Sequence, residues 1–349
     1  MYFAAAALWS MARAMTVLCA TFRRGAWPRG WLIHSIGGPQ GLGVLSDCRS
    51  QGCLVNVSTH GGVSMVNDRW LERRAGTHLL ATALIRHSLD WLRPHRVPAL
   101  RQAYEAQPDS YFDDLESQIS AVIRASGQDL AAGLHDLDSF NRLTPEVEND
   151  VWYDQPSAFT SMHLDTLLLG FGRRRLLALA GLVGDFAPAN AFVLEVGSGS
   201  GWLADKLLGS FPGWRLTLAD RSAAATSFCQ EFLSARGHSA RFTCSHSSLE
   251  RLPWAGAHFD LVIAAEVLEH SHDPIGGVAE LMRVLKPQGR LAVSLPIALD
   301  IAMHPTVFSD DESMLCFFAE QGLVPELCEV VIPDTSLDAI CDVFPGFQG

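Results

Sequence analysis

From residue 191 to residue 295, short apolar runs alternate with segments of helical pattern, and this alternation limits the fold more than any other feature. The runs with strand character are 191–196, 215–220, 240–245, 260–267 and 289–295. The helical segments between them are about 201–210, 221–236 and 274–285, and a helix at about 310–321 and a strand at 326–332 follow. Apolar strands separated by helices are typical of a parallel sheet covered on both faces. The sequence therefore predicts an α/β fold with a doubly wound, mainly parallel, Rossmann-like sheet.

The part of the chain before this alternation has a helical pattern. We expect helices at about 67–93, 108–127 and 158–182. Asn67 can cap the first of them and Pro94 ends it, while Gly127 ends the second. We predict that residues 65–190 form a helical cap or lid that closes a small pocket and excludes water, and that residues 191–349 form the core domain.

Residues 1–64 differ from both of these parts. They carry a net charge of +4, so the overall charge of −12 leaves −16 for residues 65–349. Their apolar start is interrupted by Arg13, and the basic pair Arg23 and Arg24 follows the apolar stretch instead of preceding it, unlike a signal peptide. A glycine-rich stretch without clear periodicity comes next. We expect an extension without a stable fold, with Met65 as the true start, and a cleaved export signal is the alternative.

A glycine-rich loop follows the first strand of the core, in the stretch VLEVGSGSGWLADKL (193–207). Gly197, Gly199 and Gly201 permit positive φ and close approach of a ligand to the backbone. The helix that follows offers unpaired N–H groups and a partial positive charge. Ligands of open parallel sheets bind at this edge, outside the carboxyl ends of the strands. The loop is therefore the first candidate for a binding site.

The loop does not suit a phosphate ligand well. No Gly-Lys-Ser/Thr sequence follows, which excludes a P-loop. A dinucleotide-binding loop has the pattern GxGxxG, and when it is counted from Gly197 its third glycine is replaced by Trp202. Counted from Gly199, the pattern GxGxxA ends at Ala204, so a dinucleotide remains an alternative ligand. Glu195, directly before the loop, would repel a pyrophosphate and attract a cationic ammonium group.

These features resemble the class I S-adenosylmethionine-dependent methyltransferases, small-molecule branch, over about residues 150–335. The resemblance rests on four motifs in order. They are the loop Glu195-Val-Gly-Ser-Gly-Ser-Gly201, Asp220 at the end of the second strand, DLVIAAEVLEH at 260–270, and LMRVLKPQGRLAVSLP at 281–296. The resemblance implies S-adenosylmethionine as the cofactor.

The resemblance also implies roles for single residues. Glu195 would act on the methionine ammonium group and Asp220 on both ribose hydroxyls, where its charge strengthens the hydrogen bonds. Ser248 stands where the family usually has an acid beside the adenine. The full set of expected cofactor residues is Glu195, Gly197, Ser198, Gly199, Gly201, Asp220, Arg221, Ser248, Leu249 and Glu266.

Methyl transfer needs positioning of the acceptor more than it needs a catalytic group, and a base only where the acceptor must lose a proton. His270 is the main candidate for that base because an ordinary imidazole titrates near neutrality. Tyr153 is expected to contact the methionyl end or the substrate, and His304 the substrate. No metal site is expected, because in HSHD (270–273) Asp273 caps a helix and His272 is exposed.

Composition narrows the function further. The acidic body argues against nucleic-acid partners, no apolar run is long enough to span a membrane, and eight scattered cysteines suit a reducing cytoplasm.

We expect an enzyme that methylates a small molecule, with a homodimer compatible with the sequence. The Arg-rich composition, with only two lysines, favours a secondary-metabolite context. The alternatives are cyclisation of the cofactor's own aminobutyrate arm with release of methylthioadenosine, a non-catalytic cofactor-binding subunit, and an NAD-dependent oxidoreductase.

Overall fold

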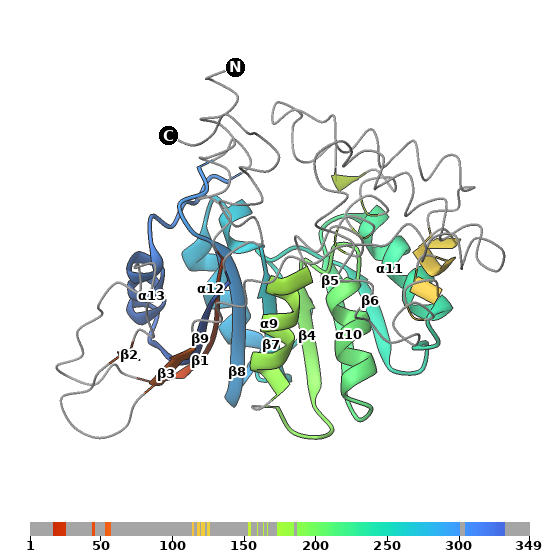
Figure 1. Ribbon diagram of the computed structural model, residues 1–349, viewed down its shortest axis with the longest axis horizontal. Coiled ribbons are helices and arrows are strands. Elements are labelled where there is room, and N and C mark those ends of the chain that lie inside the picture. Colours follow the sequence, from red (N-terminus) through yellow and green to blue (C-terminus); the bar gives the residue numbers. More distant parts are fainter. Residues whose placement is uncertain are drawn as a thin grey trace, which may run out of the picture.

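The computed structural model contains a nine-stranded mixed sheet with helices on both faces (Figure 1). It describes residues 17–25, 44–45, 53–56, 173–184, 187–300 and 304–331, and single positions between 114 and 166. The order of the strands across the sheet is β2-β3-β9-β1-β8-β7-β4-β5-β6.

The centre of the sheet consists of five parallel strands, as the alternation predicts. These are β4 (Phe192–Val196), β5 (Arg215–Asp220), β6 (Phe242–His246), β7 (Phe259–Ala265) and β8 (Leu285–Pro296). The helices that connect or flank them are α9 (Arg173–Gly184), α10 (Trp202–Ser210), α11 (Ala223–Ala235) and α12 (Pro274–Val284). After β8, α13 (Asp311–Glu320) leads into β9 (Leu323–Val331). The predicted doubly wound α/β fold is confirmed.

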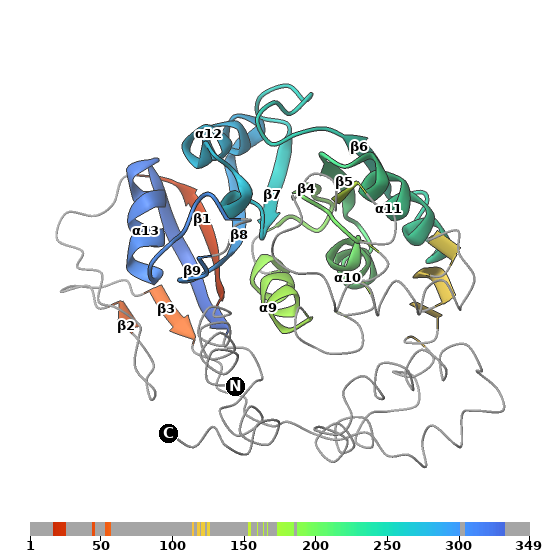
Figure 2. The same cartoon turned by 90° about the horizontal axis from the view of Figure 1, so that it is seen from above.

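Alternate side chains of the strands enter two separate apolar layers. On β4, Val193 packs in one layer with α9, α10 and α11, and Leu194 and Val196 pack in the other with α12 and α13. Figure 2 shows α9 and α10 on the opposite side of the sheet from α12 and α13. Because successive residues of a strand point to opposite faces, an apolar run is what a strand covered on both sides requires.

The strand β1 (Val17–Arg24) corrects the expectation of an unstructured extension at residues 1–64. It lies between β8 and β9 and is antiparallel to both. Leu18, Ala20 and Phe22 are fully buried in the α12–α13 layer, and Val17 and Cys19 are buried in the other layer. Its apolar run is therefore a central strand that is covered on both faces. Two short strands, β2 (Val44–Leu45) and β3 (Cys53–Asn56), continue the sheet beyond β9.

Most of the expected helical cap (65–190) lies outside the described residues, and so do the tail after residue 331 and most of residues 1–64. Where residues of the cap are described, they contact the core: Arg236 donates to Asp114 at 2.6 Å, and Lys206 lies 3.4 Å from the same carboxylate. The expected helix at 158–182 corresponds in its second half to α9. None of the described helices is long and apolar enough to cross a membrane.

Candidate functional site

A cavity of about 340 Å³ opens at the carboxyl ends of β4, β5 and β7. Every site residue predicted from the sequence lines this cavity except Gly201. Those lining residues are Tyr153, Glu195, Gly197, Ser198, Gly199, Asp220, Arg221, Ser248, Leu249, Glu266, His270 and His304. The topology brings them together because parallel strands end at the same edge of the sheet.

The glycine loop turns sharply between β4 and α10. Gly197, Gly199 and Gly201 have φ of +68°, +49° and +72°, in the left-handed region that glycine adopts without strain. Gly201 is the N-cap residue of α10, where a Cβ atom would lie 3.0 Å from the Cys229 sulfur. Its role is therefore to form the turn, and it does not face the cavity.

We expect Gly197→Ala to distort the loop. The added Cβ would lie 2.3 Å from Val267 Cγ2 and would force positive φ on alanine, a conformation that costs about 1–2 kcal/mol. The matched control is Gly209→Ala in α10, where nothing lies within 4 Å of the added Cβ and about 0.5–1 kcal/mol of stabilisation is expected. Thermal unfolding of the two variants checks this prediction. Equal melting temperatures would contradict it.

Asp220 ends β5 at the rim of the cavity, with its side chain buried. Its Oδ2 accepts the Gly199 N–H at 2.9 Å, and its Oδ1 accepts the Ser222 N–H at 2.9 Å. The carboxylate thus holds the glycine loop against the start of α11. Because a carboxylate oxygen can accept two hydrogen bonds, each oxygen keeps an acceptor position for a ligand.

Glu195 is the last charged side chain before the loop and is buried in the cavity wall. Its Oε2 has no hydrogen-bond partner among the described residues. Burial, and next to it the Asp220 carboxylate, raise the pKa of Glu195 to about 8. A cation placed beside this carboxyl would favour its ionised form.

The residues after β6 form another part of the cavity wall. Leu249 is buried, and Ser248 donates a hydrogen bond to Glu250 Oε2. Glu250 also lines the cavity, so a carboxylate is present on this wall although position 248 itself is serine. Inspection of position 248 alone does not reveal this carboxylate, because Glu250 follows Ser248 by two residues.

His163, which belongs to the segment predicted to form the cap, supports the glycine loop. Its Nδ1 lies 3.0 Å from the Ser200 carbonyl oxygen, and its ring packs on Phe232 at 4.2 Å between centroids. The imidazole is completely buried, and this burial lowers its pKa from 6.5 to about 4.

The free energy of unfolding is therefore expected to fall as the pH decreases from about 6.5 to about 4. In this window the unfolded chain binds a proton at His163 that the folded chain does not bind, and the effect is at most about 3 kcal/mol. Urea unfolding at several pH values compares the protein with His163→Gln, which keeps a hydrogen-bonding side chain but does not titrate. If the difference in free energy of unfolding between the protein and His163→Gln stays constant with pH, the prediction is contradicted.

Three rings line the other end of the cavity, next to the 3-10 turn η1 (Leu268–His270). Tyr153 meets His270 edge-on at 6.0 Å between centroids, and His270 meets His304 edge-on at 4.8 Å. Burial, and then the Glu269 carboxylate, raise the pKa of Tyr153 to about 12. Its phenol is thus a hydrogen-bond donor at neutral pH. The backbone of Tyr153 is held by Ser222, whose hydroxyl donates to the Tyr153 carbonyl at 2.5 Å.

Two charged residues of this region, Arg175 and Glu269, were not predicted from the sequence. Arg175 of α9 forms an ion pair with Glu266 at 3.4 Å, across ninety residues of chain, which local patterns do not reveal. Glu266 itself has φ of +55°, which a residue other than glycine rarely adopts. Glu269 directly precedes His270 in the LEH sequence, and its side chain is buried in the cavity wall. The adjacent histidine was the available signal for it.

Comparison with known proteins places the central segment of the chain. Residues 194–293 match the family described as "Methyltransferase domain". Over 102 residues the chain is 35% identical to a malonyl-(acyl-carrier protein) O-methyltransferase of Hahella chejuensis. This alignment covers 29% of this chain and 35% of that protein. Over 150 residues it is 29% identical to a ubiquinone biosynthesis O-methyltransferase of Dinoroseobacter shibae. This second alignment covers 41% of this chain and 57% of that protein.

Among solved structures, the (4+2)-cyclase SpnF is 27% identical over 33% of this chain and 43% of its own, with a TM-score of 0.32. The chain thus spans between a third and just under three fifths of the two curated relatives that it matches.

Proposed function

Because residues 194–293 are a methyltransferase domain of the class I S-adenosylmethionine-dependent family, we propose that the protein methylates a small molecule in the cavity at the ends of β4, β5 and β7. S-adenosylmethionine is the cofactor that this family implies. It supplies a methyl group that the sulfonium charge has already activated. The observation that carries the proposal is that Glu195 and Asp220 line the same cavity next to the glycine loop.

The cavity wall fits this cofactor. The unpartnered Glu195 Oε2 would bind the ammonium group of the methionine arm, which compensates its burial. The acceptor positions that Asp220 keeps would bind the ribose hydroxyls, and Leu249 would lie against the adenine. Gly197 and Gly199 carry no side chain where the ligand must approach the backbone. Glu250 would take the place of the acid that the family usually has at position 248.

The residues at the other end of the cavity would hold the acceptor. Tyr153 would orient it through its hydroxyl, while His270 and His304 would lie near the atom that receives the methyl group. Positioning of this kind can contribute about 7–11 kcal/mol to catalysis. The Arg175–Glu266 ion pair lies on this wall and would limit which charged groups the acceptor can carry.

Product analysis tests the reaction. The full chain is incubated with S-adenosylmethionine alone and with a panel of phenols, carboxylic acids and amines. S-adenosylhomocysteine that forms only when an acceptor is present supports the proposal. Methylthioadenosine that forms without any acceptor would show instead that the cofactor's own arm is the substrate. No product in either case, from a protein that binds the cofactor, would favour a non-catalytic role.

A further inference from the structure

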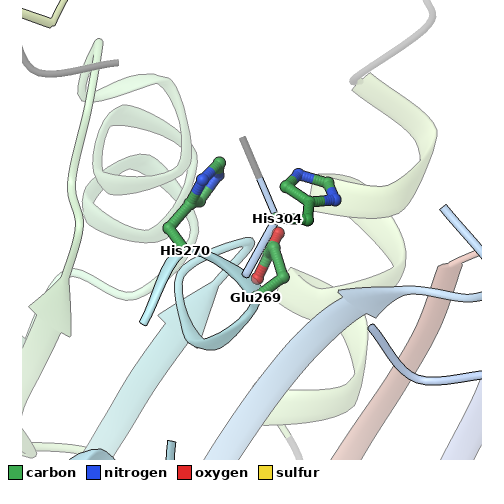
Figure 3. Close-up of side chains that lie close together, drawn as sticks. All are labelled: Glu269, His270 and His304. Atoms are coloured by element: carbon green, nitrogen blue, oxygen red, sulfur yellow. The ribbon is translucent and has the colours of Figure 1, made fainter. Parts of the chain in front are cut away.

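Three side chains that can ligate a metal converge at the acceptor end of the cavity. Glu269, His270 and His304 each offer one ligand atom, and these atoms lie within 4.8 Å of one another. In Figure 3 the Glu269 carboxyl and the two imidazoles approach a common space beside η1. They come from two segments, the turn after β7 and the loop after β8.

One oxygen of the buried Glu269 carboxyl lacks a hydrogen-bond partner. Its side chain is 1% exposed, and its Oε2 has no hydrogen-bond partner among the described residues. A buried polar atom without a partner destabilises the folded protein, and a charged one does so more strongly. The Arg175 guanidinium forms its ion pair with Glu266 instead. A cation at Glu269 would remove this cost.

His304 is oriented as a metal ligand usually is. Its Nδ1 lies 3.1 Å from the Leu299 carbonyl oxygen. An N–H donated to this carbonyl leaves Nε2 with a free lone pair, and metal-binding histidines are commonly held in this way.

The two segments that carry the ligands are tied to each other. The Thr306 hydroxyl donates to the Ser271 carbonyl at 2.8 Å, and the Thr306 N–H donates to the Glu269 carbonyl at 3.2 Å. The loop that carries His304 is thus fixed against η1, so the three ligand groups are brought together before any ion binds.

We propose that Glu269, His270 and His304 bind one divalent transition-metal ion, with Zn²⁺ as the probe, and leave a coordination position open to the cavity. Two imidazoles and a carboxylate form a ligand set that zinc uses at catalytic sites, where a fourth position stays free. In a tetrahedral site with ligand atoms about 2.0–2.2 Å from the ion, these atoms lie about 3.3–3.6 Å apart. The three ligand atoms, which lie within 4.8 Å of one another, would have to approach one another by at most about 1.5 Å. Small rotations of the side chains therefore complete the site.

This metal site would add a catalytic group to the proposed methyl transfer, and its catalytic role rests on that proposed function. The ion's open coordination position would take the acceptor's oxygen and lower the pKa of its hydroxyl group, so that the proton leaves to water. The acceptor class would then be a compound with a hydroxyl group. No metal site was expected from the sequence, in which residues 270–273 were the candidate cluster. Of these, Asp273 indeed caps α12 and His272 is exposed. The structure groups His270 with Glu269 and His304 instead.

The test is a calorimetric titration of the full chain with Zn²⁺ after removal of metals by a chelator. One ion per chain is expected. Glu269→Gln and His304→Ala should each weaken binding by about 10–100-fold or more, a range that even outer-shell substitutions reach. The matched control His272→Ala, two residues from His270, should bind as the unmodified protein does. Failure to bind one Zn²⁺, or equal affinity in the three variants, would overturn the proposal.

A second measurement covers the case in which a variant does not fold. The visible absorption of the unmodified protein loaded with Co²⁺ should show four- or five-coordination, and a six-coordinate spectrum would overturn the proposal. Binding of S-adenosylmethionine, measured in the same samples, separates the two hypotheses. Zn²⁺ binding without cofactor binding would refute only the proposed function. Cofactor binding without Zn²⁺ binding would refute only the metal site.

Discussion

A chain that begins at Met65 is expected not to fold, whereas a chain that begins at Met15 is expected to fold. The first lacks β1 and the second keeps it. Without β1, both β8 and β9 lose a neighbour, and both apolar layers of the core open. Burial of Val17, Leu18 and Phe22 alone contributes roughly 5–9 kcal/mol, which is comparable to the whole net stability of a typical domain, about 5–15 kcal/mol.

Circular dichroism and thermal unfolding of the purified chains check this result. Because the Met65 chain also lacks β2 and β3, two substitutions in the full chain isolate β1. Ala20→Asp places a carboxylate in the buried centre of the strand and should prevent folding. Arg23→Ala, whose side chain is 50% exposed, should change the free energy of unfolding by less than about 1 kcal/mol. A folded Met65 chain with unchanged stability would show that β1 is not part of the core.

Asp220→Ala is expected to weaken binding of S-adenosylmethionine by about 10–150-fold. A hydrogen bond to a charged group contributes about 1.5–3 kcal/mol, and this variant also releases the glycine loop from its contact with Gly199. The matched control is Asp273→Ala. Asp273 likewise accepts a backbone N–H, from Gly276 at the start of α12, but it does not line the cavity.

Calorimetry with S-adenosylmethionine measures both variants. Asp273→Ala should lose about 0.5–2 kcal/mol of stability through its helix cap and keep its affinity for the cofactor. If Asp220→Ala binds as tightly as the control, Asp220 has no part in the cofactor site.

The core of the fold could be predicted because its signals are local. Each central strand is an apolar run bounded by a helix start, and Asp220 and Glu195 follow from their places at the ends of two such runs. The position of β1 could not be predicted in this way. Its partners in β8 and β9 lie about 270 to 310 residues further along the chain, and a short apolar run does not reveal which strands it will join.

The acceptor end of the cavity was predicted only in part for the same reason. His270 and Tyr153 come from motifs, but the position of Glu269 depends on η1, which turns its side chain into the protein interior. Arg175 meets Glu266 only after α9 has packed against the sheet. Contacts of this kind depend on tertiary structure, because Arg175 carries no pattern in the sequence that distinguishes it from a solvent-exposed charge.

The central claim is that the cavity lined by Glu195 and Asp220 binds S-adenosylmethionine. Its most direct test is calorimetry of the full chain with this compound and, separately, with NAD⁺. We predict one S-adenosylmethionine bound per chain and no measurable binding of NAD⁺. Tighter binding of NAD⁺ than of S-adenosylmethionine, or no binding of S-adenosylmethionine by the folded protein, would contradict the account.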